Sequence, residues 1–187
     1  QYGQLYMGIY YFKPENKNYN FQKAFHYFKL SADQKNANSC YFLGQIYFLG
    51  KDVPKDIIKG IQYFTIAAKG KIPEAQYKLG VIYFEGQYVK RNSEEAIKYL
   101  TAASDQNICD AQYYLGSIYY EGKNFIHDEE KAIHFATLAA NQNNMEAQRL
   151  LGQIYLNKIP SFKVTFDGNI QFHYSKKFEL DLNIDLV

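Results

Sequence analysis

The residues best suited to acid/base or metal chemistry stand together, with His127 followed directly by Asp128, Glu129 and Glu130. A histidine beside carboxylates can relay a proton or help to hold a metal ion. The same run also suits the start of a helix, where aspartate accepts hydrogen bonds from free amides and acidic side chains complement the helix dipole. We favour this structural interpretation, and we predict neither a metal ion nor a cofactor.

Recognised catalytic motifs are missing from the rest of the sequence. It contains no H-E-x-x-H, no paired C-x-x-C, no G-x-G-x-x-G, no Walker loop and no S-x-x-K. His26 and His134 occupy one position of the repeat described below, where the other copies carry Gln62 and Lys98. That column is typical of an exposed polar helix face. We therefore predict that the chain is not an enzyme.

The composition favours a globular interaction protein. The 187 residues are 47% hydrophobic and 21% charged, and no apolar run approaches the roughly 18 residues of a membrane span. The net charge is only +2, and lysines are interleaved with acidic residues. Basic pairs such as Lys90-Arg91 and Lys176-Lys177 are therefore interpreted as solvated faces. We predict no membrane span and no nucleic-acid partner.

A repeat of 36 residues organises the chain. Its five marker glycines each follow Met or Leu and precede a tyrosine by three residues; they are Gly8, Gly44, Gly80, Gly116 and Gly152. Self-similarity at a period of about 20 to 50 residues is the signature of stacked repeats that cover each other's hydrophobic faces. Positions are counted below from this glycine. We predict four full repeats and a final half repeat over residues 1–157.

Apolar residues recur at helical spacing within each repeat. Leu43, Ile46 and Tyr47 fall at i, i+3 and i+4, and later copies keep the pattern. We therefore predict two helices per repeat, helix A and helix B. The predicted A helices span about 2–12, 37–49, 73–85, 109–121 and 145–157. The predicted B helices span about 20–34, 56–69, 92–105 and 128–141.

Local signals mark the helix ends. Gly50, Gly86 and Gly122 stand just past helix A, where glycine readily takes the left-handed conformation that ends a helix. Asn92 and Glu95 form a capping-box pair at the start of a helix B. The predicted caps of helix B are Asn20, Asp56, Asn92 and Asp128.

The marker glycine lies inside helix A, where it costs about 1 kcal/mol relative to alanine. We expect a tight helix contact to require the missing side chain, with a bulky ring from helix B or a neighbouring repeat packing on Gly80. The residues given this structural role are Gly44, Gly80, Gly116 and Gly152, with the tyrosines Tyr47, Tyr83 and Tyr119 at position +3.

Two segments carry a family resemblance. A-Q-Y-K-L-G-V-I-Y-F-E-G (75–86) and A-Q-Y-Y-L-G-S-I-Y-Y-E-G (111–122) fit the pattern A-x-x-x-L-G-x-x-Y-x-x-G of the Sel-one-like repeat, a relative of the tetratricopeptide repeat. The resemblance implies an all-α fold, a right-handed superhelical α/α solenoid of antiparallel helix pairs. It also implies a protein-protein adaptor. One departure is the missing second loop glycine, since position +8 carries Asp52, Tyr88 and Asn124.

Cysteine usage indicates the compartment. Secreted cysteine-rich relatives of this family staple each repeat with a pair, whereas Cys40 and Cys109 fall at different positions of the repeat here. The chain also lacks an N-x-[ST] glycosylation site. We predict a reducing compartment and a cytoplasmic location.

Helix A carries the predicted binding surface. By analogy with the tetratricopeptide arrangement, positions −6, −3, +1, +4 and +5 face a concave groove. Aromatic side chains at −3 and +4 suit a protein or peptide ligand, because rings give large contact areas at low entropic cost. The alternative is that these rings only pack successive A helices. The predicted groove residues are Phe12, Tyr41, Phe48, Tyr77, Phe84, Glu85, Tyr113, Tyr120, Glu121 and Arg149, with Glu74, Asp110 and Glu146 able to add an acidic rim.

The last thirty residues follow a different pattern. Phe162, Val164 and Phe166 alternate with polar residues before Asp167-Gly168-Asn169, and the alternation resumes afterwards. This predicts a hairpin and a third strand within 158–187, whether as a cap on the last helix or as part of a further domain. The whole sequence favours an interaction scaffold. The alternatives are the docking or regulatory region of a larger enzyme such as a kinase, or a secreted hydrolase-like repeat protein.

Overall fold

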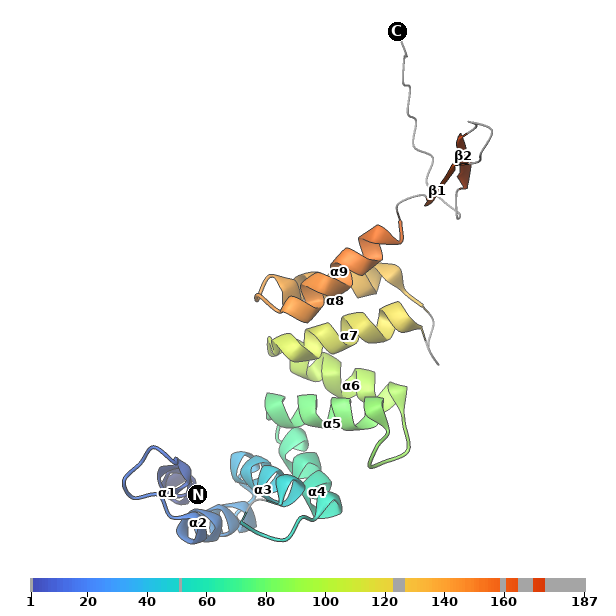
Figure 1. Ribbon diagram of the computed structural model, residues 1–187. Helices are drawn as coiled ribbons and strands as arrows, with labels where there is room; N and C mark the ends of the chain where they lie inside the picture. Colours follow the sequence, from blue (N-terminus) through green and yellow to red (C-terminus); the bar gives the residue numbers. More distant parts are fainter. Residues whose placement is uncertain (1, 51, 123–126, 159–160, 165–169, 174–187) are drawn as a thin grey trace.

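The computed structural model describes residues 2–50, 52–122, 127–158, 161–164 and 170–173. Within them the chain forms nine α-helices, which Figure 1 shows stacked from blue α1 to orange α9. The A helices are α1 (Tyr2–Phe12), α3 (Ala37–Leu49), α5 (Pro73–Glu85), α7 (Cys109–Glu121) and α9 (Met145–Leu156). The B helices are α2 (Phe21–Asp33), α4 (Ile57–Lys69), α6 (Ser93–Ser104) and α8 (Glu129–Ala140). Their order and ends match the predicted ranges to within a single residue.

Each helix packs mainly on its neighbours in sequence. Every B helix lies between the A helix of its own repeat and the A helix of the next one. Leu43, Leu79 and Leu115 are fully buried at the same position of successive A helices. Burial of such side chains stabilises each junction by about 1.5–3 kcal/mol per residue. The predicted all-α repeat solenoid is confirmed, with its buried residues in successive clusters along the stack.

The marker glycines admit side chains from helix B. A Cβ atom built on Gly8 or Gly44 would lie only 2.6 Å from the ring of Phe28 or Phe64. Both rings are fully buried. Close packing of these rings offsets the weak helix propensity of glycine.

The contact at Gly80 differs from the expected ring. The side chain that faces it is Leu100, whose Cγ would lie 2.5 Å from an added Cβ. At Gly116 the nearest atom is the backbone nitrogen of Ala136, at 3.1 Å. The expectation of a ring at Gly80 is wrong because the helix-B residue at this contact is phenylalanine only in the first two repeats. Leucine and alanine follow, and at the alanine the glycine meets backbone instead of a side chain.

Helix B begins as predicted, except for the capping box. All four cap side chains accept a hydrogen bond from the amide three residues on. Glu95 does not return a bond to Asn92, however. The Asn92 amide donates to the carbonyl of Tyr83, and the Glu95 carboxylate pairs with Lys98 at 3.1 Å. The box is half formed because the preceding helix A already satisfies the cap amide.

Helix A ends in the predicted way, and helix B ends in another. Gly50, Gly86 and Gly122 take left-handed φ values of 70°, 69° and 60°. Helix B instead places a lysine or asparagine in the left-handed conformation, at Lys35, Lys71, Asn107 and Asn143. The following amide then donates to a carbonyl five residues back, as Asn36 does to Ser31. This is the Schellman pattern, which satisfies the last carbonyls of the helix.

A β-hairpin follows the helices. β1 (Ser161–Val164) and β2 (Ile170–His173) pair antiparallel, with Phe162 opposite Phe172. The two predicted strands of the hairpin are thereby found. The predicted turn over 167–169 and the third strand over 178–186 lie outside the described residues. The assignment of 158–187 to a cap or to a further domain stays a prediction.

Candidate functional site

The tyrosines at position −3 of helix A lie at the junctions between repeats. Tyr41, Tyr77 and Tyr113 are each half-buried. The ring centroid of Tyr41 lies 6.0 Å from that of Phe64 in α4, and Tyr77 lies 6.0 Å from Tyr114 in α7. Part of each ring therefore packs between helices, and the remainder stays accessible to a partner.

The rings at position +4 also combine packing with exposure. Phe12 lies 6.1 Å from Phe42 of the next A helix, and Phe84 lies 5.9 Å from Tyr114. Arg91 covers the ring of Phe84 at 5.0 Å. The four rings Phe12, Phe48, Phe84 and Tyr120 are all half-buried. The packing alternative therefore accounts for the buried part of each ring, and the rest of each ring is exposed.

Polar contacts hold Tyr120 at the end of α7. Its hydroxyl accepts a hydrogen bond from the Asn157 amide at 2.6 Å, and its carbonyl lies 2.8 Å from His127 Nδ1. Asp128 caps α8 through the amide of Lys131, and the Lys131 ammonium group, followed by that amide, lowers the Asp128 pKa by hydrogen bonding. The cluster that begins at His127 is therefore engaged in ending one helix and starting the next. Across the described residues, no group of three or more His, Cys, Asp or Glu is placed to hold a metal ion.

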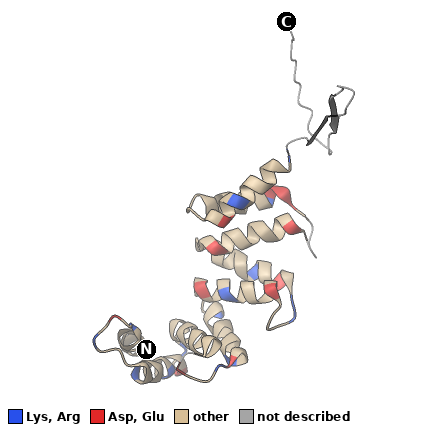
Figure 2. Cartoon of the chain, in the orientation of Figure 1, with Lys and Arg blue, Asp and Glu red and all other residues tan. Residues whose placement is uncertain are grey.

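Acidic residues border the tyrosines. Figure 2 shows an acidic residue in red at the start of each of α5, α7 and α9, where the sequence has Glu74, Asp110 and Glu146. Glu85, at the other end of α5, is exposed, as is Glu121 of α7. In the part of the chain that the structure describes, no ion pair involves Glu74 or Glu85. The carboxylates of Glu74 and Glu85 therefore stand beside partly exposed rings without an ion-pair partner among the described residues.

The surroundings of two tyrosines keep their hydroxyls protonated. Burial raises the pKa of Tyr77, and the carboxylates of Asp110 and Glu85 raise it further. Burial likewise raises the pKa of Tyr41, with a smaller contribution from Glu74. A neutral phenol can both donate and accept a hydrogen bond. Both tyrosines can therefore contact polar groups of a partner at neutral pH.

Arg149 pairs with an acidic residue of its own helix and also contacts Tyr113 of α7. Its Nε and Nη2 atoms donate to Oε2 of Glu146 at 3.0 and 2.8 Å. Both side chains are 59% exposed. An ion pair this exposed is weakened by solvent, so it does not prevent Arg149 from turning to a partner.

The tyrosines at position +3 have a structural role. Tyr47 stacks on Tyr63 of helix B, with centroids 5.7 Å apart and planes 3° from parallel, and Lys59 lies 4.3 Å above the Tyr47 ring. Equivalent stacks at 5.9 Å join Tyr11 to Tyr27, Tyr83 to Tyr99 and Tyr119 to Phe135. The partner column in helix B is aromatic in every full repeat. That regularity in the sequence could have revealed the stack in advance.

Glutamine pairs, which the motifs did not single out, tie helix A to the turn that follows helix B. The side-chain oxygen of Gln76 accepts from Gln106, and that of Gln112 accepts from Gln142, each at 2.8 Å. Gln76 and Gln112 are buried, so these bonds satisfy amides that would otherwise be costly. The signal was a repeated glutamine at position −4, found at Gln4, Gln76, Gln112 and Gln148.

A hollow of about 460 Å³ opens beside the first two A helices. It lies between the end of α1, the loop after α1 and the end of α3. Three of its lining residues, Phe12, Gln45 and Leu49, stand at positions +4, +1 and +5, which were predicted to face a groove. Its volume falls in the range typical of ligand sites, about 300–1,000 Å³.

Sequence comparison identifies the repeat unit. The model of the Sel1 repeat matches four times, over residues 1–36, 37–71, 73–108 and 109–144. These four matches cover most of the chain. The chain belongs to the Sel1 repeat family. Proteins built from Sel1 repeats generally act as protein-interaction scaffolds without catalytic activity.

Solved Sel1 repeat structures share this architecture. The protective antigen c5321 of uropathogenic Escherichia coli is 31% identical with a TM-score of 0.78, over 83% of this chain and 33% of that chain. A Sel1 repeat protein from Oxalobacter formigenes is 28% identical with a TM-score of 0.74, over 81% of this chain and 62% of that chain. The chain thus spans less than two thirds of both. Cysteine rich protein B of Helicobacter pylori shares the fold at 22% identity, with a TM-score of 0.53 over 74% of this chain and 99% of that chain. No curated protein matched the chain.

The Sel1 repeats of this chain carry free cysteines. Cys40 is buried in α3, and Cys109 begins α7. Burial raises the pKa of the Cys40 thiol, and the Asp33 carboxylate raises it further, which lowers its reactivity. Among the described helices of the Sel1 array, none is long and apolar enough to cross a membrane.

Proposed function

We propose that this Sel1 repeat chain is a non-catalytic scaffold that binds a protein or peptide along the exposed face of its A helices. One observation carries the proposal: partly exposed rings recur at positions −3 and +4 of successive A helices, bordered by carboxylates. Rings held in place by packing contact a partner at little further entropic cost. Such anchors dominate the energy of many protein interfaces.

Photocrosslinking tests which face binds. A photoreactive amino acid is placed at Leu49 or Glu85 of the A-helix face, or at His26 or His134 of the B helices, all of which are exposed. We expect proteins from a cell extract to be crosslinked from the first two positions and not from the histidines. Mass spectrometry of the crosslinked products measures this difference.

Two controls make the result decisive. Excess unmodified chain should compete away the product at Leu49 and Glu85, because a specific surface is saturable. Crosslinks of equal yield from the A-helix and B-helix positions would contradict the proposed face. Circular dichroism spectra of the variants should coincide, since all four substituted side chains are exposed.

We also propose that the chain works in the cytoplasm without binding nucleic acid. The free thiols of Cys40 and Cys109 and the net charge of +2 support this. Fluorescence microscopy of the tagged full-length protein tests the location, and a secretory distribution would contradict it.

A further inference from the structure

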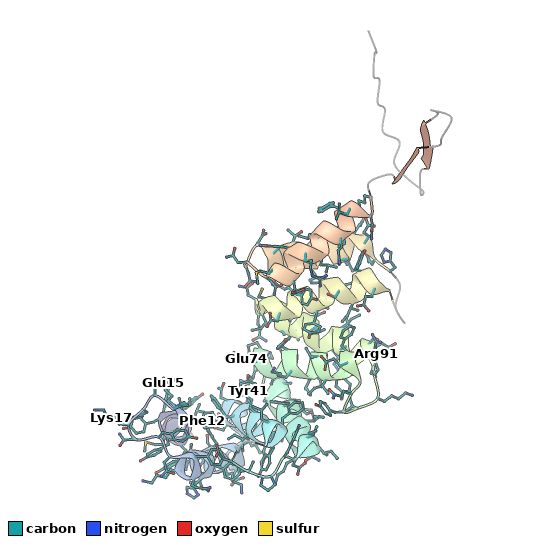
Figure 3. All side chains as sticks on the ribbon, in the orientation of Figure 1. Phe12, Glu15, Lys17, Tyr41, Glu74 and Arg91 are labelled. Carbon is teal, nitrogen blue, oxygen red and sulfur yellow. The ribbon has the colours of Figure 1, made fainter. Side chains whose placement is uncertain are left out.

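The hollow beside α1 and α3 has an apolar floor and a charged rim. Phe21 and Ile46, which line it, are 8% and 3% exposed, whereas Leu49 on its wall is 68% exposed. The carboxylates of Glu15 and Asp52 stand at its edge. Figure 3 shows Phe12 and Glu15 at the same end of the first repeat. A hollow of this kind fits one large apolar side chain with a polar group beside it.

The next repeat shows what fills the equivalent place. Phe12 corresponds to Phe48 one period later, and Asp52 corresponds to Tyr88. The ring of Tyr88 packs edge-on against Phe48, with centroids 5.2 Å apart and planes at 86°. At the first junction the position of that tyrosine is taken by aspartate. The chain therefore provides Phe48 with a ring from this loop position, whereas Phe12 and Asp52 line a hollow.

The loop that carries Asp52 also departs from its copy. Asp52 has a φ of 62°, a left-handed conformation that non-glycine residues seldom adopt. The other non-glycine residues in this conformation among those described all stand at the end of a helix B. Tyr88, at the equivalent place, does not adopt it. The chain thus follows a different path beside the hollow than beside Phe48.

Charge favours a cationic neighbour for the bound ring. Glu15 and Asp52 contribute two carboxylates to the rim, and Lys13 contributes one ammonium group. Among the described residues, neither carboxylate takes part in an ion pair. A partner with lysine or arginine next to its aromatic side chain would therefore find an oppositely charged edge.

We propose that this hollow binds an aromatic side chain of a partner peptide, adjacent to a lysine or arginine, in the way that Tyr88 packs on Phe48. The proposal rests on the proposed scaffold function, because the hollow opens on the same A-helix face. It names the anchor residue and the charge of the segment that the scaffold holds.

The test uses capped dipeptides with the complete chain. Acetyl-Phe-Arg-amide is titrated into the labelled protein, and amide chemical shifts are followed by nuclear magnetic resonance. We expect saturable shifts at Gln45, Leu49 and the loop after α1. Acetyl-Ala-Arg-amide should bind about tenfold more weakly, as expected for loss of a buried ring. Acetyl-Phe-Glu-amide should also bind more weakly, because its carboxylate meets Glu15 and Asp52.

Three substitutions make the test specific. Asp52→Tyr places a bulky ring at the edge of the hollow and should abolish dipeptide binding. Leu49→Ala removes an exposed wall of the hollow without touching the loop, and should weaken binding while leaving the melting temperature unchanged. Tyr88→Asp should create a second binding site against Phe48, detected as a second set of shifts.

The outcomes distinguish the proposed aromatic-binding hollow from the proposed scaffold function. The proposal that the hollow binds an aromatic side chain would be overturned by equal binding of the alanine and phenylalanine dipeptides. Shifts confined to helices α5–α9 would overturn it as well. If Asp52→Tyr abolishes dipeptide binding while crosslinking from Glu85 persists, the anchor holds and the partner has further contacts. If dipeptides fail to bind although crosslinks map to the A-helix face, the scaffold stands and the anchor is wrong.

Discussion

Single residues in this chain serve packing and recognition at once. Phe84 touches Tyr114 of the next repeat and lies under Arg91, yet its ring is only half-buried. Tyr77 packs beside the same Tyr114. Truncating either ring therefore changes stability as well as binding. Substitutions that keep the ring and change one polar atom are better probes of this surface.

The hydroxyl of Tyr77 gives a prediction in alkaline solution. Its pKa is raised in the folded chain, chiefly by burial and then by Asp110. An unfolded tyrosine ionises at pH ~10, and below that pH both states keep the phenol proton. As the pH rises above it, the unfolded chain loses the proton first, so the unfolding free energy falls. Tyr77→Phe should therefore lose less unfolding free energy between pH ~9 and ~11 than the parent chain. Urea unfolding at several pH values measures this.

The matched control is Tyr6→Phe, because Tyr6 is 68% exposed. It should keep the pH dependence of the parent chain. Parallel pH dependence for Tyr77→Phe and the parent would show that the Tyr77 environment is not the one described.

At the scale of helices, one repeated contact takes three forms. The marker glycine meets a phenylalanine ring in the first two repeats, a leucine at Gly80 and the backbone of Ala136 at Gly116. No described atom lies within 4 Å of a Cβ built on Gly152. The fifth A helix, α9, therefore keeps the glycine without the helix-B contact that explains the glycine elsewhere.

Alanine substitution should distinguish these contacts. Gly152→Ala is expected to stabilise the chain by up to about 1 kcal/mol, because alanine has the higher helix propensity and meets no described neighbour. Gly44→Ala should destabilise it by about 1–3 kcal/mol, since the new methyl group collides with the Phe64 ring. Denaturant unfolding measures both changes. Destabilisation by Gly152→Ala would mean that another part of the molecule covers α9.

At the scale of the molecule, stability comes from a chain of neighbouring junctions. Each helix in Figure 1 contacts the helices before and after it, so no single junction carries the whole core. Stacks of this kind gain stability as a sum over repeats and their interfaces. The main described contacts of α9 are with α7 and α8.

This organisation predicts the effect of removing residues 159–187. Because the main described contacts of α9, with α7 and α8, involve none of residues 159–187, we expect the shortened chain to melt within about 2 °C of the parent, less than a 1 kcal/mol change would produce. Differential scanning calorimetry and light scattering measure melting and aggregation. Aggregation of the shortened chain would instead favour a cap that shields α9.

The linear sequence alone specified the period, the helices and most of their ends. Caps such as Asn20 and stops such as Gly50 act on amides and carbonyls within a few residues, so local chemistry suffices to predict them. Each local signal recurs in several repeats, which strengthens the prediction. The aromatic positions −3 and +4 of helix A were recognised from the same recurrence.

Packing in three dimensions settled what each column touches. The half-formed box at Asn92, the leucine against Gly80 and the hollow beside Phe12 all depend on distances between helices and loops distant in the chain. Those distances reflect side-chain sizes contributed by more than one element at once. The ring of Tyr88 packs on Phe48, whereas Asp52, at the same position of the preceding repeat, lines a hollow with Phe12. The sequence shows the two residue types, but only the structure shows what each one does to the neighbouring phenylalanine.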